Sequence, residues 1–539
     1  MILKEIFYKI GNVIIDKSYY KKEYDNDNII ENEILSSIKT NSYEHLLAKD
    51  NRWEILYNLY WKRENILSGI SFRQNPEILE IGCGCGSITG LLCKKSKSVT
   101  AVEISGRRAE IAAYKNKNYE NLKIIVGNIK DIKLEKKFDY VTLIGVLEHA
   151  GLYYNGNEAW SEFLKLAKNF LKPDGIMIIA IENRLGLKYW CGDIEEHSGM
   201  LFEGILGYPN STTVKTFSRN ELISLLHSVG LYDYRWFYPY PDYKFPTDIY
   251  TDEYMPQIEH LEEELFNKYP KKKVLPELEM FKSIISAGLY KEFSNSFLVL
   301  CSNDKNSLID QPEYIHFSHL RKMNTAICTL IQNKNGKKVI YKIATTDEQK
   351  RHLEIIAENC QILNKMYGKE HVAQCKFLDE TTLEMEYIDG EKYDDLMIRA
   401  LNEDGPNGLS EYIDFYCKNI LKGQPDTQTD IEYDFMNPHR KYNVDLHFEN
   451  IIVSNNNYII IDYEWLNESI PTKYVLYRAL VLFYTKKKNV LNKYNIDIAL
   501  LLEAIGITEM ELKKYMIWNN EFVLPQLDEY LFQYVKDNK

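Results

Sequence analysis

Hydrophobic and polar positions follow two alternating periods in the first 300 residues of the chain. Between residues 43 and 70 apolar side chains recur every three or four positions, which is typical of amphipathic helices. Short apolar runs separated by segments of helical period then follow at 77–81, 99–104, 123–126, 140–144, 176–181 and 297–301. Short strands that alternate with helices predict an α/β fold with a doubly wound, Rossmann-like sheet covered on both faces.

The pattern changes after a short polar linker at residues 302–307. Alternating segments at 326–332 and 338–343, joined by Asn-Lys-Asn-Gly, predict a β-hairpin. A helix is expected over 347–366 and a strand over 382–388, and helical segments dominate afterwards. A β-rich small lobe followed by a helical large lobe predicts a two-lobed α+β domain.

These patterns divide the chain into three parts. Residues 1–42 are polar and predict a partly ordered N-terminal extension, and residues 43–303 predict the α/β domain. An acidic, proline-punctuated insertion is expected within that domain at about 240–290. Residues 310–539 predict the α+β domain.

Composition and charge exclude several classes of function. The chain has 539 residues, of which 45% are hydrophobic, and a net charge of −12 with acidic and basic residues mixed. Nucleic-acid binding is not expected, because it needs a concentrated basic face. The nine cysteines lack metal-ligand spacing, so we interpret them as reduced thiols of a cytoplasmic protein. Neither a signal peptide nor an apolar run of about 18 residues is found, so no transmembrane segment is expected.

The first candidate site follows the predicted strand at 77–81. Glu80 precedes the glycines Gly82, Gly84 and Gly86, and Glu103 lies at the end of the next predicted strand. Glycines let the backbone turn tightly and approach a ligand closely, and an acid at this spacing can accept hydrogen bonds from ribose hydroxyls. A dinucleotide-binding dehydrogenase shares this pattern. Glu80 would repel a pyrophosphate, however, so S-adenosylmethionine (SAM) is the expected ligand.

This region resembles the class I SAM-dependent methyltransferases. The resemblance implies that Asn128 and Ile129 contact the adenine, with Asn128 standing where the family usually has an aspartate. The segment Ile-Gly-Val-Leu-Glu-His at 144–149 resembles the motif that faces the methyl group, which makes His149 a candidate for contact with the acceptor. In the alternative, Glu148 and His149 only cap the preceding strand.

Two further acceptor-binding candidates follow the fifth predicted strand. Arg184 and His197 lie where doubly wound sheets bind ligands, at the carboxyl ends of their strands. Arg184 suits an anionic acceptor, and a surface ion pair is the equally weighted alternative.

The second candidate site lies around residue 450. Asp445 is followed five positions later by Asn450, and Asp462 comes after two predicted strands. This layout suits phosphoryl transfer, because one aspartate orients and deprotonates a hydroxyl while the other two side chains hold the Mg²⁺ that bridges the phosphates of ATP. Lys342 ends a hairpin strand where a phosphate-pairing lysine is expected.

This half resembles the aminoglycoside and choline kinase branch, through Asp-Leu-His-Phe-Glu-Asn at 445–450 and Ile-Asp-Tyr-Glu at 461–464. The resemblance implies a glutamate partner for Lys342, either Glu354 or Glu358, of which Glu358 is favoured. It also implies that the segment from Glu386 to Ile388 offers backbone groups to adenine. The chain departs from the pattern at Asn443, where a histidine is usual, and it lacks a glycine-rich loop between 317 and 329.

The tandem arrangement resembles bacterial methyltransferase–kinases that terminate O-antigen polysaccharides. The resemblance implies a bifunctional enzyme of surface-glycan biosynthesis, which phosphorylates a terminal sugar or sugar-linked group with ATP and then methylates that phosphate with SAM. A phosphate oxygen is already anionic at neutral pH, so no strong base is expected in the first site. A glycan or sugar-phosphate acceptor, a glycosyltransferase partner at the inner membrane face and a membrane-peripheral location follow from the same resemblance. Two alternatives remain: a methyltransferase acting on a nitrogen or hydroxyl beside an independent kinase, or a kinase-like lobe that only regulates the methyltransferase.

Overall fold

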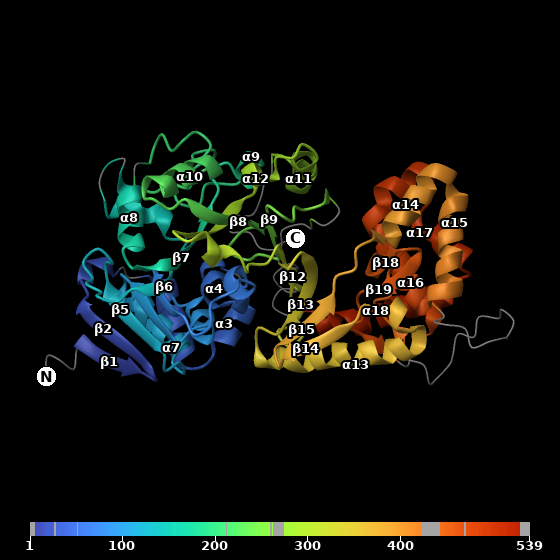
Figure 1. Cartoon of the computed structure of the whole chain (residues 1–539), viewed down its shortest axis with the longest axis horizontal. Helices are drawn as coiled ribbons and strands as arrows, with labels where there is room; N and C mark the ends of the chain where they lie inside the picture. Colours follow the sequence, from blue (N-terminus) through green and yellow to red (C-terminus); the bar gives the residue numbers. More distant parts are fainter. Residues whose placement is uncertain are drawn as a thin grey trace. The chain divides into compact units, whose positions relative to one another are not determined.

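The computed structural model describes residues 6–25, 28–50, 52–154, 156, 158–211, 213–258, 261, 274–421, 442–467 and 471–528. The chain forms two compact units (Figure 1), with the boundary between His319 and Leu320. The expected linker at 302–307 therefore lies inside the first unit. Within the described ranges, no helix combines the length and the apolar character needed to cross a membrane.

One mixed sheet organises the first unit, in the order β1-β2-β5-β4-β3-β6-β7-β10-β8-β9-β11. Its strands are β1 Phe7–Ile10, β2 Val13–Tyr19, β3 Glu77–Ile81, β4 Ser98–Glu103, β5 Leu122–Gly127, β6 Phe138–Ile144, β7 Leu171–Glu182, β8 Asp233–Tyr240, β9 Asp248–Thr251, β10 Ser296–Ser302 and β11 Tyr314–Phe317. The strands from β2 to β7 pair in parallel, and β10 pairs antiparallel with β7 and β8. The predicted doubly wound sheet is confirmed, and the carboxyl ends of its central strands meet at one edge.

Helices cover this sheet because its central strands are apolar on both faces. Leu79 in β3 and Ile179 in β7 on one face, and Ile78 in β3 and Ile178 in β7 on the other, are fully buried. Apolar residues of α8 such as Leu164 are buried as well. The helices of the unit are α2 Ile29–Lys39, α3 Tyr43–Lys49, α4 Trp53–Leu59, α5 Asn65–Ser68, α6 Thr89–Lys94, α7 Gly106–Lys115, α8 Ala159–Lys168, α9 Leu187–Trp190, α10 Arg219–Ser228, α11 Glu277–Ser286 and α12 Tyr290–Phe293.

The N-terminal segment departs from the expectation of a separate, partly ordered extension. β1 and β2 form a hairpin at the edge of the sheet (Figure 1), and β2 pairs in parallel with β5. Val13 and Ile15 are completely buried, whereas Ile14 between them is exposed on the other side of the strand. The described part of the expected insertion at 240–290 is also integral, since Tyr250 of β9 and Phe281 of α11 belong to the main core.

The second unit combines an antiparallel sheet with a larger number of helices. The sheet has the order β12-β13-β15-β14, from β12 Cys328–Lys334, β13 Lys337–Ile343, β14 Cys375–Asp379 and β15 Thr382–Glu386. The predicted hairpin is present as β12 and β13. Helix α13 Lys350–Tyr367 buries Leu353, Ile356 and Leu363, which form one face of the predicted helix.

The remainder of the second unit is mainly helical. Its helices are α14 Tyr393–Asp404, α15 Pro406–Phe415, α16 Thr472–Leu491, α17 Ile498–Ala504 and α18 Glu509–Val523. Its short strands are β16 Glu391–Lys392, β17 Tyr442–Asn443, β18 Ile451–Ser454, β19 Asn457–Ile460 and β20 Leu466–Asn467. Because β18 and β19 pair with each other, they place Asn450 and the segment after Ile460 at the same end of one hairpin.

Candidate active sites

A cavity of about 390 Å³ opens at the carboxyl edge of the sheet in the first unit. This volume lies within the range of small-molecule sites, roughly 300–1,000 Å³. The predicted site residues that line it are Glu80, Gly82, Gly84, Glu103, Asn128, Ile129 and His149. They come from the ends of β3, β4, β5 and β6, because parallel strands deliver the residues that follow them to one edge.

The turn after β3 adopts a backbone conformation that favours glycine. Gly82, Gly84 and Gly86 have φ values of +74°, +54° and +75°. A Cβ on Gly84 would meet no atom within 4 Å, whereas a Cβ on Gly86 would lie 2.9 Å from Cα of Ala112. Gly84 therefore leaves room beside the cavity, and Gly86 allows the turn to pack closely on α7.

Two buried acids flank this turn. Glu103 accepts hydrogen bonds from the backbone N–H groups of Gly84 at 2.9 Å and Ser105 at 3.0 Å. Glu80 accepts a hydrogen bond from Oγ1 of Thr89 at 2.7 Å, and burial together with the charge of Glu103 raises its pKa to about 7. Burial also raises the pKa of Glu103. Buried carboxylates of this kind suit a ligand that carries hydroxyl groups and positive charge.

Residues from the N-terminal helices complete the cavity, and the motif analysis did not identify them. Glu31 and Ile34 of α2, Tyr57 of α4 and Arg63 all line it. Arg63 is 1% exposed, its guanidinium lies 4.4 Å from the ring centre of Tyr57, and it donates a hydrogen bond to the carbonyl of Tyr243 at 3.2 Å. The helical spacing at 43–70 indicated burial of this segment but not its place beside the cavity.

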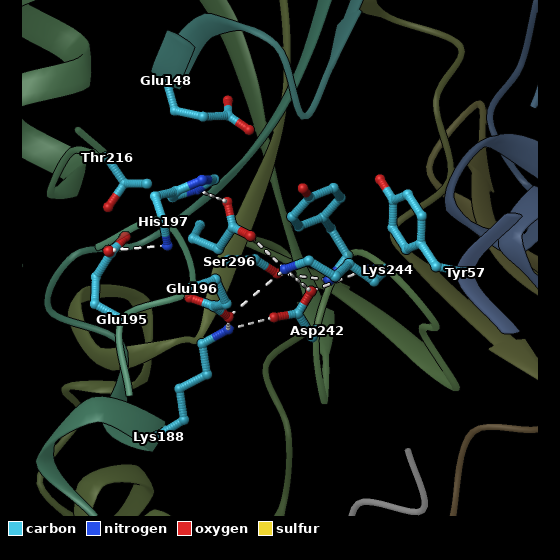
Figure 2. A network of polar contacts seen from close by, with 12 residues as sticks. Tyr57, Glu148, Lys188, Glu195, Glu196, His197, Thr216, Asp242, Lys244 and Ser296 are labelled. Carbon is cyan, nitrogen blue, oxygen red and sulfur yellow. Dashed lines mark hydrogen bonds and ion pairs between the residues drawn. The ribbon is translucent and has the colours of Figure 1, made fainter. Parts of the chain in front are cut away.

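A buried polar network lies next to the cavity (Figure 2). The ring of His149, which lines the cavity, lies 5.1 Å from the ring of His197, which does not line it. Burial and the charge of His197 lower the pKa of His149 to about 4. Burial alone would lower the pKa of His197, but Glu182 and Glu148 raise it to about 9. The structure therefore brings two of the three predicted acceptor-binding residues together.

Arg184, the third predicted acceptor-binding residue, is engaged elsewhere. Its Nε donates to Glu221 at 2.6 Å, and its Nη1 donates to the carbonyls of Gly204 and Ile205. It does not line the cavity. In the structure Arg184 therefore forms an ion pair, which was the alternative to a role in acceptor binding.

The predicted residues of the second site gather in the second unit. Nζ of Lys342 lies 3.5 Å from Oδ1 of Asp462, and Nδ2 of Asn450 donates to the carbonyl of Asp445 at 2.8 Å. Asp445 lies 3.4 Å from Nη2 of Arg478, and burial raises the pKa of both Asp445 and Asp462.

Asn443, where a histidine was expected, joins the two halves of this site. Its Nδ2 donates to the carbonyl of Asp462 at 2.7 Å, and its Oδ1 accepts from the backbone N–H of Asp445 at 3.0 Å. An asparagine therefore ties the two aspartates together through their backbones.

The glutamate partner of Lys342 differs from the prediction. Glu354 and Glu358 both lie on the exposed face of α13 and pair with Arg351, at 2.8 and 3.0 Å. Lys342 instead pairs with Glu464, which also binds Arg321 and lies 3.3 Å from His352. Burial alone would raise the pKa of Glu464, but the charges of Arg321 and Lys342 hold it well below its usual value. Glu464 lies only two positions after Asp462, and this short separation is the sequence feature that could have identified it as the partner of Lys342.

The expected hinge lies at the end of β15. The backbone N–H of Glu386 donates to the Gln374 carbonyl at 3.0 Å, and Oε2 of the Glu386 side chain accepts from the Gln374 N–H at 2.9 Å. Ile388 follows the strand and is half-buried. Glu386 is the last residue of β15 and lies opposite Val339 of β13, and its N–H is already bonded to Gln374.

Comparisons with known proteins identify the first unit. The family described as "Methyltransferase domain" matches residues 79–179. The chain is 30% identical over 188 residues to the ubiquinone biosynthesis O-methyltransferase of Rickettsia akari, covering 33% of this chain and 70% of the relative. It is 29% identical over 172 residues to the protein of the same name from Rickettsia canadensis, covering 31% and 67%.

Among solved structures, the chain is similar to the N-methyltransferase NodS of Bradyrhizobium japonicum in complex with S-adenosyl-L-homocysteine. The sequence identity is 21%, the match covers 26% of this chain and 71% of that one, and the TM-score is 0.20. For phosphoethanolamine N-methyltransferase 1 of Haemonchus contortus the identity is 14%, the coverage 52% and 51%, and the TM-score 0.29.

The doubly wound sheet and the glycine-lined cavity are the features of a SAM-dependent methyltransferase. Through its first unit, the chain belongs to the SAM-dependent methyltransferase family. The matching relatives account for about a third of the chain.

Proposed function

We propose that the chain is a bifunctional enzyme that phosphorylates a sugar or sugar-linked group of a surface glycan and then methylates that phosphate. The observation that supports the pairing is the presence of two separate sites on one chain. One is the cavity of a methyltransferase, and the other gathers Asp445, Asn450, Asp462 and Lys342. A glycosyltransferase at the inner membrane face is the proposed partner, and a cytoplasmic, membrane-peripheral location is proposed with it.

The residues of the first site fit SAM. Glu103 would accept hydrogen bonds from the ribose hydroxyls of SAM. Asn128 and Ile129 would contact its adenine, and Glu80 would face its positively charged end. The free space beside Gly84 and the raised pKa of Glu80 support this arrangement, because a buried acid ionises more readily beside a cation. SAM supplies an electrophilic methyl group.

An acceptor phosphate needs orientation more than activation. Its oxygen is anionic at neutral pH, so the task of the protein is to hold that oxygen in line with the methyl group and to exclude water. His149 lies on the cavity wall and is the candidate for contact with the acceptor.

The second site fits a magnesium nucleotide. Oδ1 of Asp462 is buried, accepts no hydrogen bond from the described residues and lies 3.5 Å from Nζ of Lys342, which suits an oxygen that can bind a cation. Asn450 would be the second ligand, Lys342 would pair the phosphates, and Asp445 would orient the acceptor hydroxyl. Since Lys342 contacts Asp462 and Glu464, nucleotide binding requires it to exchange partners.

A second candidate function rests on the relatives. Those named above are O-methyltransferases by name, and this favours an oxygen acceptor over a nitrogen, here a hydroxyl in place of a phosphate. In that case the first unit acts without prior phosphorylation, and the second unit is an independent kinase or a regulatory lobe.

Asp445→Asn separates the two functions. The full chain is incubated with radiolabelled ATP, radiolabelled SAM and extracted cell-surface glycan. We expect the substitution to reduce phosphoryl transfer by roughly 10²–10⁴-fold, the usual contribution of a general base, and to reduce methyl transfer equally. Asp414→Asn, which changes an exposed aspartate of the same unit, is the matched control and should retain both activities.

Methyl transfer that continues unchanged in Asp445→Asn would contradict the ordered scheme and favour the second candidate. Binding of ATP without phosphoryl transfer by the unsubstituted protein would favour the regulatory lobe.

A further inference from the structure

Three side chains in the first unit are arranged as ligands of a metal ion. Glu148 lies in the 3₁₀-helix Leu147–Leu152, Glu182 ends β7, and His197 lies in the loop after α9. Each offers one ligand atom, and the three atoms lie within 4.8 Å of one another. Figure 2 shows Glu148 on one side of His197, with the lysine-rich part of the network on the other.

Each of these side chains has a buried polar atom without a hydrogen-bond partner. The atoms are Oε2 of Glu148, Oε2 of Glu182 and Nε2 of His197. Glu148 and Glu182 are each only 1% exposed. Nε2 of His197 lies 3.9 Å from Oε2 of Glu182, which is too far for a hydrogen bond. Buried polar groups are nearly always partnered. Three unpartnered atoms on side chains whose ligand atoms lie within 4.8 Å of one another therefore suit a bound cation.

The neighbouring lysines do not fill this position. Lys188 is bound at 2.6 Å to both Glu196 and Asp242. Lys244 contacts Oε1 of Glu182 and lies 3.6 Å from Asp242. The two lysines together form ion pairs with three carboxylates, those of Glu182, Glu196 and Asp242. Glu148 is a fourth carboxylate, and its Oε2 receives no hydrogen bond from the described residues.

We propose that Glu148, Glu182 and His197 bind a divalent transition-metal ion such as Mn²⁺ or Zn²⁺. Two carboxylate oxygens and one imidazole nitrogen form a mixed donor set that suits these ions. Three protein ligands also leave coordination positions open, as in catalytic metal sites.

The site adjoins the cavity wall. Oε1 of Glu148 lies 3.6 Å from the position of a Cβ on Gly145, and Gly145 and His149 both line the cavity. An ion here would attract an acceptor oxygen, orienting a phosphate or lowering the pKa of a hydroxyl. This role rests on the proposed function, whereas metal binding itself does not.

The test is a Mn²⁺ titration of the full chain after removal of metals with EDTA, followed by electron paramagnetic resonance. The Asp462→Asn variant is used without nucleotide, so that the second unit does not contribute a cation site. We expect about one Mn²⁺ per chain, and a nitrogen hyperfine coupling from His197 in the spin-echo spectrum. Glu148→Gln and His197→Gln should each weaken binding at least tenfold, and His197→Gln should abolish the nitrogen coupling.

Matched controls separate this result from general damage. Glu162→Gln and His227→Gln change exposed residues of the same unit and should bind Mn²⁺ like the parent. Calorimetric binding of S-adenosylhomocysteine shows that each variant retains its fold. The proposal is overturned if the parent binds neither Mn²⁺ nor Zn²⁺, or if folded Glu148→Gln and His197→Gln bind as tightly as the controls. Because no ATP or glycan is present, failure of the bifunctional scheme would not affect the outcome.

Discussion

The two candidate sites differ in what occupies the space between their charged groups. The first is a cavity of about 390 Å³, walled by a glycine turn and by acids that hydrogen-bond to backbone and hydroxyl groups. In the second, the acids contact cations of the same unit: Lys342 binds Glu464, and Arg478 lies beside Asp445.

This difference implies two modes of ligand binding. A ligand of the first site fills existing space and gains mainly from burial and a few polar contacts. A ligand of the second site must replace ion pairs that already stabilise the fold, so charge complementarity decides its affinity. Stability should therefore depend on shape in the first unit and on charge balance in the second.

Lys342→Met should produce the largest effect. It leaves the buried Glu464 and the half-buried Asp462 with less positive charge nearby, and breaking a buried pair costs about 3–5 kcal/mol. Denaturant unfolding should show this loss in the second unit, with the first unit unchanged. Adding Asp462→Asn should restore part of the stability, because Glu464 keeps its ion pair with Arg321 whereas Asp462 loses its contact with Lys342.

The control for that change is Lys418→Met, which removes an exposed lysine paired with Asp414. If it destabilises the second unit as much as Lys342→Met does, charge balance in the buried site is not what stabilises the unit.

Gly86→Ala tests the dependence on shape in the first unit. The substitution combines a left-handed backbone with a Cβ that would lie 2.9 Å from Cα of Ala112. The expected cost is about 2–4 kcal/mol of unfolding free energy, from backbone strain and overpacking. Gly84→Ala, with no atom within 4 Å of the new Cβ, should cost only about 1–2 kcal/mol. Equal losses in thermal unfolding would show that packing on α7 is unimportant.

The raised pKa of Glu80 provides a third test, because it makes both the stability of the first unit and its ligand binding depend on pH. Burial raises the pKa of Glu80 to about 7, from 4.5 in an exposed chain. The folded state therefore retains a proton that the unfolded chain has lost, and the stability contributed by Glu80 decreases as the pH rises from 4.5 to 7.

The affinity for SAM should change in the opposite direction. A cationic ligand favours ionised Glu80, so affinity should rise about tenfold between pH 6 and 8. Glu80→Gln should abolish this increase in calorimetric titrations. A variant that keeps the same pH profile as the parent would remove Glu80 from the binding site.

The smallest effect is expected for Glu358→Gln and Glu354→Gln. Both side chains are more than half exposed and pair only with Arg351 among the contacts described. Exposed ion pairs contribute little, so phosphoryl transfer and ATP affinity should stay within about twofold of the parent. A large loss of phosphoryl transfer in Glu358→Gln would instead support the predicted pairing of Glu358 with Lys342. That pairing would require α13 to rotate when ATP binds.

Local sequence patterns were sufficient for the elements and for the residues near each motif. Glu80, the glycine turn and Glu103 were predictable because they lie at the ends of adjacent parallel strands, where chain order determines position. The proximity of Asp445, Asn450 and Asp462 was predictable for a similar reason, since the first two are five positions apart and one short hairpin separates Asn450 from Asp462. The N-terminal hairpin was missed, because the polar composition of residues 1–42 concealed the buried Val13 and Ile15.

Tertiary structure alone decided which distant side chains meet. Lys342 pairs with Glu464 across 122 positions of sequence, and Glu148, Glu182 and His197 converge from three separate elements. The period of a segment specifies which of its faces is buried, but it carries no information about the segment that covers that face. That choice depends on strand order and on how the helices pack, so the partners of a buried charge are determined only when the whole core assembles.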